Sequence, residues 1–299
     1  MRKYLYTICL FFSTISISFV NAQNLDIGLN IGTSHYYGDV VNEFTPSTLG
    51  SSFGLFARYR LSGYFTAKAT LGVVNINGDD QYSSSSWQIN RNWAFKTSIY
   101  EFLAQAEYNF IEDRNRGRRF ANPFIPYISA GIGYISFSPT AELTGTTYAL
   151  APLQLSGYAY STSALVVPVA LGARAYLSRS FQLGFELGFR YTTTSHLDDI
   201  APGDVYVDPN VTPNPKLTRL FYGRAISVEN NQKGDLRSKM GNFAKTIYNS
   251  NGLNEFFGKY DFYFVPTITL AYTIGSSGGG GGRSGGGSFG KAIRCPRFF

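Results

Sequence analysis

Apolar and polar residues alternate strictly along residues 181–199, and this is the clearest pattern in the chain. Every odd position from Phe181 to Tyr191 carries an aromatic or aliphatic side chain, while glycine and polar residues occupy the positions between them. A repeat of two residues is typical of a β-strand with two different faces, not of a helix. The apolar face runs for about 11 residues, the length that a tilted strand needs to cross a bilayer. We interpret this stretch as one lipid-facing strand of a closed barrel.

Seven other stretches alternate in the same way and are separated by segments rich in Gly, Ser, Asn and Pro. The expected strands, in chain order, are residues 25–32, 53–61, 65–73, 98–111, 127–138, 164–177, 181–191 and 260–274. Eight is the smallest common strand number of an outer-membrane barrel. The predicted fold class is therefore all-β, an eight-stranded antiparallel transmembrane β-barrel.

The connections between these strands fall into two length classes. Those after residues 61 and 177 are short, whereas four others are long, the longest lying between 191 and 260. Short turns at one end and long loops at the other are typical of outer-membrane barrels, with the short turns in the periplasm and the long loops outside the cell. The connection at 111–124 is an exception, because it is long but lies on the periplasmic side.

The alternation also predicts how two neighbouring strands pair. The strands before and after residues 178–180 both place apolar residues at odd positions, so both faces match only if Leu177 pairs with Phe181 across a three-residue turn. This register makes Arg174 and Glu186 diagonal neighbours, within reach of an ion pair.

Two prolines, Pro168 and Pro266, lie inside expected strands. Proline has no backbone N–H and removes a hydrogen bond from the ladder. We therefore expect a bulge or a strand end at each of them.

Composition agrees with this fold and identifies the compartment. Aromatic residues make up 16% of the chain and charged residues only 15%, and there are 32 glycines, which suits many strands and tight turns. A mean hydropathy of -0.09 excludes a helical membrane bundle. Arg2 and Lys3 precede an apolar run that ends in the small-residue site before Gln23, so residues 1–22 are expected to be a cleaved signal peptide. A retained membrane anchor is disfavoured because Ser and Thr interrupt the run and no stop-transfer charges follow.

The expected organisation is thus a signal peptide at 1–22, an outer-membrane barrel at 23–274 and a flexible Gly-rich basic tail at 275–299. Cys9 lies in the signal and Cys295 in the tail, so the mature chain can form no internal disulfide. With only two histidines and no catalytic or phosphate-binding motif, we expect no enzyme, no cofactor, no metal centre and no nucleic-acid partner.

Charged residues lie on the polar face of several expected strands: Arg58, Arg60, Lys68, Glu101, Glu107, Arg174, Glu186 and Arg190. In an enzyme, the three glutamates would be acid/base candidates. In a narrow barrel they would instead neutralise the cations, because an unpaired buried charge is costly. The second interpretation is favoured. Asp198 and Asp199, after His196, have two interpretations of their own: a cation site at the outer rim, or carboxylates that cap a loop.

Two basic segments are expected on the periplasmic side, because both ends of an even-stranded barrel leave on one side. The first is the connection at 111–124, and the second is the tip of the tail. Their cations are Arg114, Arg116, Arg118 and Arg119, and then Lys291, Arg294 and Arg297. Each segment could be simply solvated, or it could dock an acidic periplasmic partner through its guanidinium groups.

Four stretches together resemble the PorG-like outer-membrane proteins of Bacteroidetes, the β-barrel component associated with type IX secretion. They are YYGD at 36–39, YEFLAQAEYNF at 100–110, PYISAGIGYISFSP at 126–139 and GFELGFRYTTTSHLDDI at 184–200. The resemblance covers most of residues 23–274, although His196 stands where relatives commonly carry an aromatic residue. It implies a non-enzymatic barrel, surrounded by outer-membrane lipid, that anchors a periplasmic ring made of a lipoprotein and its partner. The alternative is a stand-alone surface barrel that binds ligands through its long loops, as adhesins do.

Overall fold

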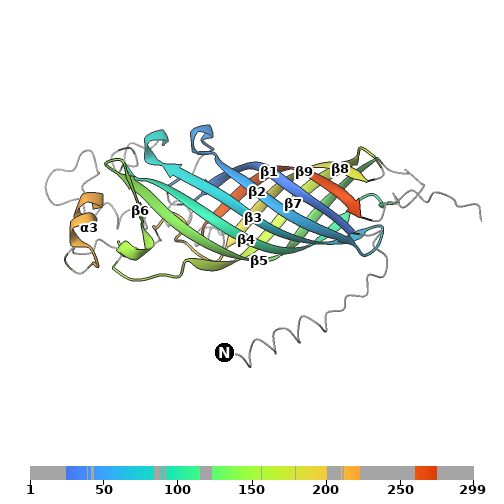
Figure 1. Ribbon diagram of the computed structural model, residues 1–299. Helices are drawn as coiled ribbons and strands as arrows, with labels where there is room; N and C mark the ends of the chain where they lie inside the picture. Colours follow the sequence, from blue (N-terminus) through green and yellow to red (C-terminus); the bar gives the residue numbers. More distant parts are fainter. Residues whose placement is uncertain are drawn as a thin grey trace, which may run out of the picture.

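The computed structural model describes residues 25–38, 40–41, 44–83, 89, 92–114, 123–155, 157–178, 180–200, 210, 212–222 and 260–274 (Figure 1). The expected signal peptide and the Gly-rich tail lie outside the described residues. Among the helices of the described part, none is long and apolar enough to cross a membrane.

Eight long antiparallel strands close into a barrel, as the alternation predicts (Figure 1). Each pairs with its neighbours in the chain, and the first pairs with the last to close the sheet. The strands are β1 (Leu25–Tyr37), β2 (Gly50–Arg60), β3 (Phe65–Asp79), β4 (Ala94–Asn109), β5 (Phe124–Leu143), β7 (Ser163–Tyr176), β8 (Phe181–Thr192) and β9 (Phe262–Ile274).

Short helices, turns and one short strand lie at the end of the barrel that carries the long loops. The sequence patterns did not predict β6 (Thr146–Ala149), which pairs with the last residues of β5. The helix α3 (Pro215–Tyr222) and the 3-10 turns η2 (Pro46–Thr48), η3 (Asp80–Tyr82) and η4 (Ala151–Leu153) lie in the connections between strands.

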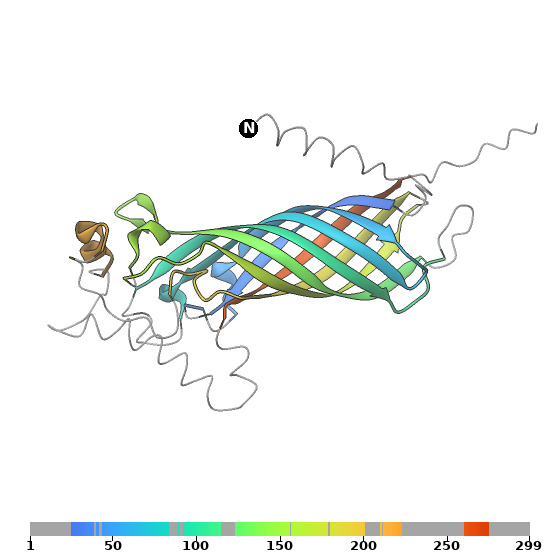
Figure 2. The same cartoon turned by 90° about the horizontal axis from the view of Figure 1, so that it is seen from below.

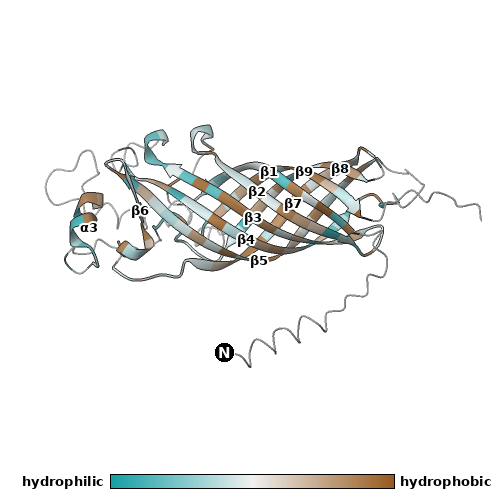
Figure 3. Ribbon diagram, in the orientation of Figure 1, coloured by the Kyte–Doolittle hydropathy of each residue, from teal (hydrophilic) through white to brown (hydrophobic). Residues whose placement is uncertain are grey.

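The outer surface of the barrel is apolar, as a bilayer requires. Residues alternate between exposed and buried along most of each long strand, and over the middle of the barrel the exposed set is aliphatic or aromatic; Phe185 is 50% exposed and Ile132 is 73% exposed. In Figure 3, brown residues alternate with paler ones along the strands of the barrel wall. Aromatic rings contact one another at both edges of this apolar band, for example Phe65 with Tyr108 at one edge and Tyr37 with Phe262 at the other. Aromatic girdles at both membrane interfaces are typical of transmembrane barrels.

The predicted hairpin register between β7 and β8 is confirmed. Leu177 donates its backbone N–H to the carbonyl of Phe181 at 2.9 Å, and Gly184 lies opposite Arg174. The ion pair expected between Arg174 and Glu186 is wrong, however. Both side chains reach across the narrow lumen to partners on other strands instead of along the wall to each other.

The expectation of bulges or strand ends at the two prolines is also wrong. The pairing of β7 with β5 pauses for two residues at Pro168, and that of β9 with β1 pauses at Pro266, but the register is the same on both sides of each gap. Both prolines keep an unbroken ladder with β8 on their other side. Next to each proline, the strand therefore lacks pairing with one neighbour but keeps its register.

The interior has two different halves. Toward the end where residues 25 and 274 lie, most inward-facing residues are charged or polar. Toward the end with the long loops, an apolar core fills the barrel and includes Ile99, Leu103, Ile135 and Val166. Loop residues complete this core, among them Leu197, which is fully buried.

Candidate functional site: the charged barrel interior and its two ends

Among the described residues, ten buried charged side chains lie on the barrel strands or at the floor, and each is at most 6% exposed; four other buried carboxylates, Asp80, Asp198, Asp199 and Asp261, belong to the end with the long loops. The cations are Arg58, Arg60, Lys68, Arg174 and Arg190, and the carboxylates are Asp26, Glu101, Glu107, Asp113 and Glu186. Five positive and five negative charges balance. A low-dielectric interior requires such a balance, because an uncompensated buried charge is strongly destabilising.

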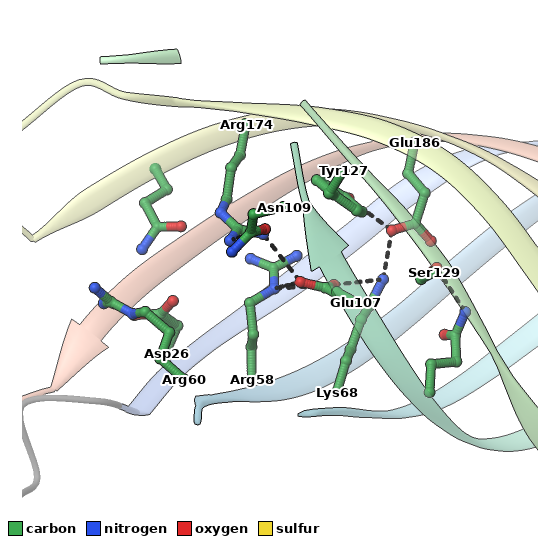
Figure 4. Close-up of polar contacts among 12 residues, drawn as sticks. Asp26, Arg58, Arg60, Lys68, Glu107, Asn109, Tyr127, Ser129, Arg174 and Glu186 are labelled. Atoms are coloured by element: carbon green, nitrogen blue, oxygen red, sulfur yellow. Dashed lines mark hydrogen bonds and ion pairs between the residues drawn. The ribbon is translucent and has the colours of Figure 1, made fainter. Parts of the chain in front are cut away.

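Glu107 on β4 is the centre of this network (Figure 4). Its carboxylate lies 2.9 Å from Nε of Arg58 and 2.9 Å from Nη1 of Arg174, which come from β2 and β7. Nζ of Lys68 on β3 is 4.0 Å away. One carboxylate thus connects four strands of the wall across the lumen.

Lys68 connects this centre to a second carboxylate, Glu186 on β8. Nζ of Lys68 lies 2.6 Å from Oε2 of Glu186, and the hydroxyl of Tyr127 donates to the same oxygen at 2.7 Å (Figure 4). The ring of Tyr127 also lies 5.1 Å from the guanidinium carbon of Arg174, which is cation–π geometry. Gly172 makes room for this ring, since a Cβ there would lie 2.5 Å from it.

The floor of the barrel is built around Asp26 and Asp113, which sequence reasoning did not identify as part of the network. Asp26 lies 2.8 Å from Nη2 of Arg60. Asp113 belongs to the connection after β4, yet its side chain is inside the barrel, where it accepts a hydrogen bond from Tyr176 at 2.7 Å. It also lies 3.8 Å from Arg60 and 3.7 Å from Arg174. The alternation could not reveal Asp113, because this residue lies beyond the end of the strand.

A third group closes the opposite end and joins two of the motifs that carry the family resemblance. Tyr36 of the YYGD stretch lies within hydrogen-bonding distance of Asp198, at 2.9 Å, and of Asp261, at 3.0 Å. Asp261 accepts the N–H of Leu197, and Asp198 accepts the N–H of Ile200. Both carboxylates therefore cap backbone N–H groups, and in the described part of the chain no group of three potential metal ligands occurs.

The three glutamates considered as acid/base candidates are all engaged in the interior. Glu107 and Glu186 form ion pairs with arginine and lysine side chains. Glu101 accepts a hydrogen bond from Tyr263 and lies 3.7 Å from Arg190. Engaged, buried carboxylates of this kind neutralise charge and connect strands. They are not placed to exchange protons with a substrate.

Residues 2–209 match the model of the family described as Domain of unknown function (DUF6089). The chain belongs to this family. The matched segment spans β1 to β8 and includes all four stretches quoted for the resemblance. A comparison with curated proteins gives no match.

Among solved structures, the chain is similar to outer-membrane proteins at very low sequence identity. Neisserial surface protein A is 10% identical, with 85% of this chain and 98% of that chain covered and a TM-score of 0.37. OprG from Pseudomonas aeruginosa is 10% identical, with 84% and 96% covered and a TM-score of 0.37. The N-terminal β-barrel domain of Pseudomonas aeruginosa OprF is 9% identical, with 84% and 97% covered and a TM-score of 0.34.

The basic segments are only partly described. Arg114 is exposed, and its Nε donates to Glu112 at 2.6 Å; this hydrogen bond raises the pKa of Arg114 above its ordinary value. The other three arginines of the connection, at positions 116, 118 and 119, lie outside the described residues, as do Lys291, Arg294 and Arg297 of the tail.

We expect the purified barrel to show no steady ionic current in a planar lipid bilayer, because paired charges and an apolar core fill its lumen. A variant carrying both Arg58→Ala and Glu107→Ala removes one charge of each sign and two large side chains. It should also show no steady current, because the apolar core at the end with the long loops still fills the lumen. A steady current through the unsubstituted protein would contradict this expectation.

Proposed function

We propose that this member of the family is a non-enzymatic barrel of the outer membrane that anchors a periplasmic ring complex of a protein-secretion apparatus, the type IX system. The outer-membrane location is supported by the apolar outer face with its two aromatic girdles and by the signal-like sequence at 1–22. The balanced, buried charges of the lumen support a structural role, since no acidic side chain there is left open to a substrate.

The observation that carries the proposal is how the arginine-rich connection begins. Its first residues are fixed to the floor of the barrel: Asp113 is held inside by Tyr176 and lies near Arg60 and Arg174, and its backbone N–H donates to Gly63 at 2.8 Å. Most barrels of this kind have short turns on this side. A connection whose base is fixed starts from a defined position on the barrel, which lowers the cost of ordering it on binding.

The chemistry of the connection indicates the kind of partner. Four arginines lie within residues 114–119, and guanidinium groups pair with carboxylates in bidentate geometry. An acidic surface of a periplasmic protein would fit them. The family resemblance proposes a lipoprotein of the secretion ring and its partner as the owners of that surface.

We expect a variant with Arg114, Arg116, Arg118 and Arg119 all replaced by glutamate to fold normally but to lose its partner. Gentle-detergent purification should recover the barrel without its periplasmic proteins, and secretion should fall, because like charges then face each other. Heat-modifiable migration on gels checks the fold. A matched control reverses Lys216 and Arg219, two exposed cations of α3 at the opposite end of the barrel. Unchanged secretion and co-purification in the four-residue variant would exclude this connection as the anchor.

The alternative, a surface adhesin, is favoured by one feature of the opposite end. The long loops there pack together around an apolar core that includes Trp93, Leu150 and Phe221. They also display exposed apolar side chains, with Phe44 at 64% and Leu220 at 56%. An adhesin would be purified alone in the experiment above, and replacing the exposed Phe44 and Leu220 by serine would abolish surface binding while leaving secretion intact.

A further inference from the structure

The outer wall of the barrel becomes polar at one level on three neighbouring strands. Near the middle, Leu71, Phe102 and Tyr134 lie side by side on β3, β4 and β5 and form a row of the apolar surface. Two rows further toward the long loops, the same outward positions are occupied by Asn75, Ser98 and Ser138. The strands continue unbroken through this change, so the surface is one sheet with an apolar part and a polar part (Figure 3).

The polar part is extended by β6 and is hollowed. Figure 2 shows β5 and β6 running past the rim formed by the other strands. A concavity of about 440 Å³ lies over this sheet, and its outward-facing lining includes Asp79, Lys96, Thr140, Glu142 and Thr147. Lys96 lies between Asn77 and Thr140 in one row, and Glu142 lies opposite Thr147 in the next. We call this concavity the wall cup.

The wall cup lies beyond the hydrocarbon and just outside the headgroup layer, which is about 5–8 Å thick on each side of a phospholipid bilayer. Tyr100 is 61% exposed on the same outward face of β4, where it marks the edge of the apolar band. Lys96 is four residues further along, or about 13 Å along the strand. With a strand tilt of about 45°, this places Lys96 about 10 Å beyond the edge of the hydrocarbon.

The groups in the wall cup are both donors and acceptors, and some of them lack a charged partner. Lys96 and Glu142 take part in none of the ion pairs formed among the described residues. Its lining holds the hydroxyls of three threonines, two carboxylates and one ammonium, and two of the hydroxyls, those of Thr140 and Thr144, donate to backbone carbonyls. A sugar offers many hydroxyls, each of which can donate and accept, so this mixture suits a saccharide. One cation beside two carboxylates suits a bare phosphate less well.

We propose that the wall cup binds the saccharide headgroup of a glycolipid in the surrounding outer leaflet. The cup is on the outer wall, continuous with the lipid-facing surface, so the molecules next to it in a membrane are lipids. This inference rests on the outer-membrane location proposed above but not on the role in secretion. Its failure would leave the partner-docking experiment unaffected, and the converse holds as well.

The test uses the full-length mature chain in detergent and counts bound lipid by native mass spectrometry. The probes are lipopolysaccharide that carries a core oligosaccharide and lipid A that lacks it. We expect the core-bearing form to bind more tightly. Lys96→Ala should weaken its binding about tenfold, as expected for the loss of one charge-assisted hydrogen bond. Thr147→Trp, which fills the cup from its edge strand, should weaken binding to a similar extent.

The control is Lys216→Ala, the same substitution at an exposed lysine of α3 outside the wall cup, which should bind like the unsubstituted chain. Equal affinity for lipid A and for the core-bearing form would overturn the proposal, because the saccharide would then contribute nothing. So would unchanged binding by both Lys96→Ala and Thr147→Trp. A second copy of the chain cross-linking through Thr147 would assign the cup to a protein interface instead.

Discussion

Replacing Glu107 by glutamine is expected to cost about 3–5 kcal/mol of folding free energy, since it breaks a buried ion network by removing one partner. Arg58 and Arg174 each lie 2.9 Å from this carboxylate, and both are 1% exposed. Water cannot reach them to compensate. The substituted chain should unfold at a clearly lower urea concentration in detergent micelles and lose its heat-modifiable migration on gels.

The matched control is Glu112→Gln in the connection that follows the same strand. Glu112 also pairs with an arginine, Arg114, but that side chain is 67% exposed. Exposed ion pairs contribute at most about 1 kcal/mol, so this variant should resemble the unsubstituted protein. If the two variants had the same midpoint of unfolding, the network around Glu107 would not be what stabilises the barrel.

The second large effect is expected on the lipid face. Leu187→Arg should lower the amount of barrel in the outer membrane, because arginine on the lipid face costs about 2–4 kcal/mol near the middle of the bilayer. Leu187 lies midway along β8 and pairs with Leu171 and Pro266, so the new charge would be surrounded by apolar groups. Quantifying the protein in isolated outer membranes measures the loss.

Ser138→Arg provides the control for depth. Ser138 faces outward like Leu187 but lies on the polar part of β5, beyond Tyr134. The same arginine should cost little there, because it lies outside the hydrocarbon. Equal abundance of the two variants would mean that the apolar band around Leu187 is not the part of the wall that contacts lipid.

The sequence alone determined the faces of the strands and the register of the hairpin between β7 and β8. A period of two places Phe185 and Leu187 on one face and Glu186 on the other, whatever the rest of the chain does. The same parity, with a three-residue turn, was enough to predict the pairing of Leu177 with Phe181. Both are local properties, because they depend only on neighbouring residues along the chain.

The alternation of apolar and polar residues could not locate the strands where the outer face itself becomes polar. Beyond Val73 and Tyr134 the strands continue, but their outward residues become Asn, Ser and Thr, so the apolar alternation ends before the strand does. The sequence pattern therefore did not predict β6 or the polar part of the outer wall on β3, β4 and β5. The two prolines were misjudged for a related reason: the sequence cannot say that β8 would hold both strands in register.

Only the tertiary structure decided which charges meet. Alternation directs Arg174, Glu107 and Glu186 inward but does not say which of them face each other across the lumen. That depends on how the sheet closes and how its strands are staggered, which fixes the residues at one height of the barrel. Asp113 lies outside any strand, and only the folded barrel brings it next to Arg60 and Arg174. A local period determines direction, whereas contact across a closed barrel is a property of the whole sheet.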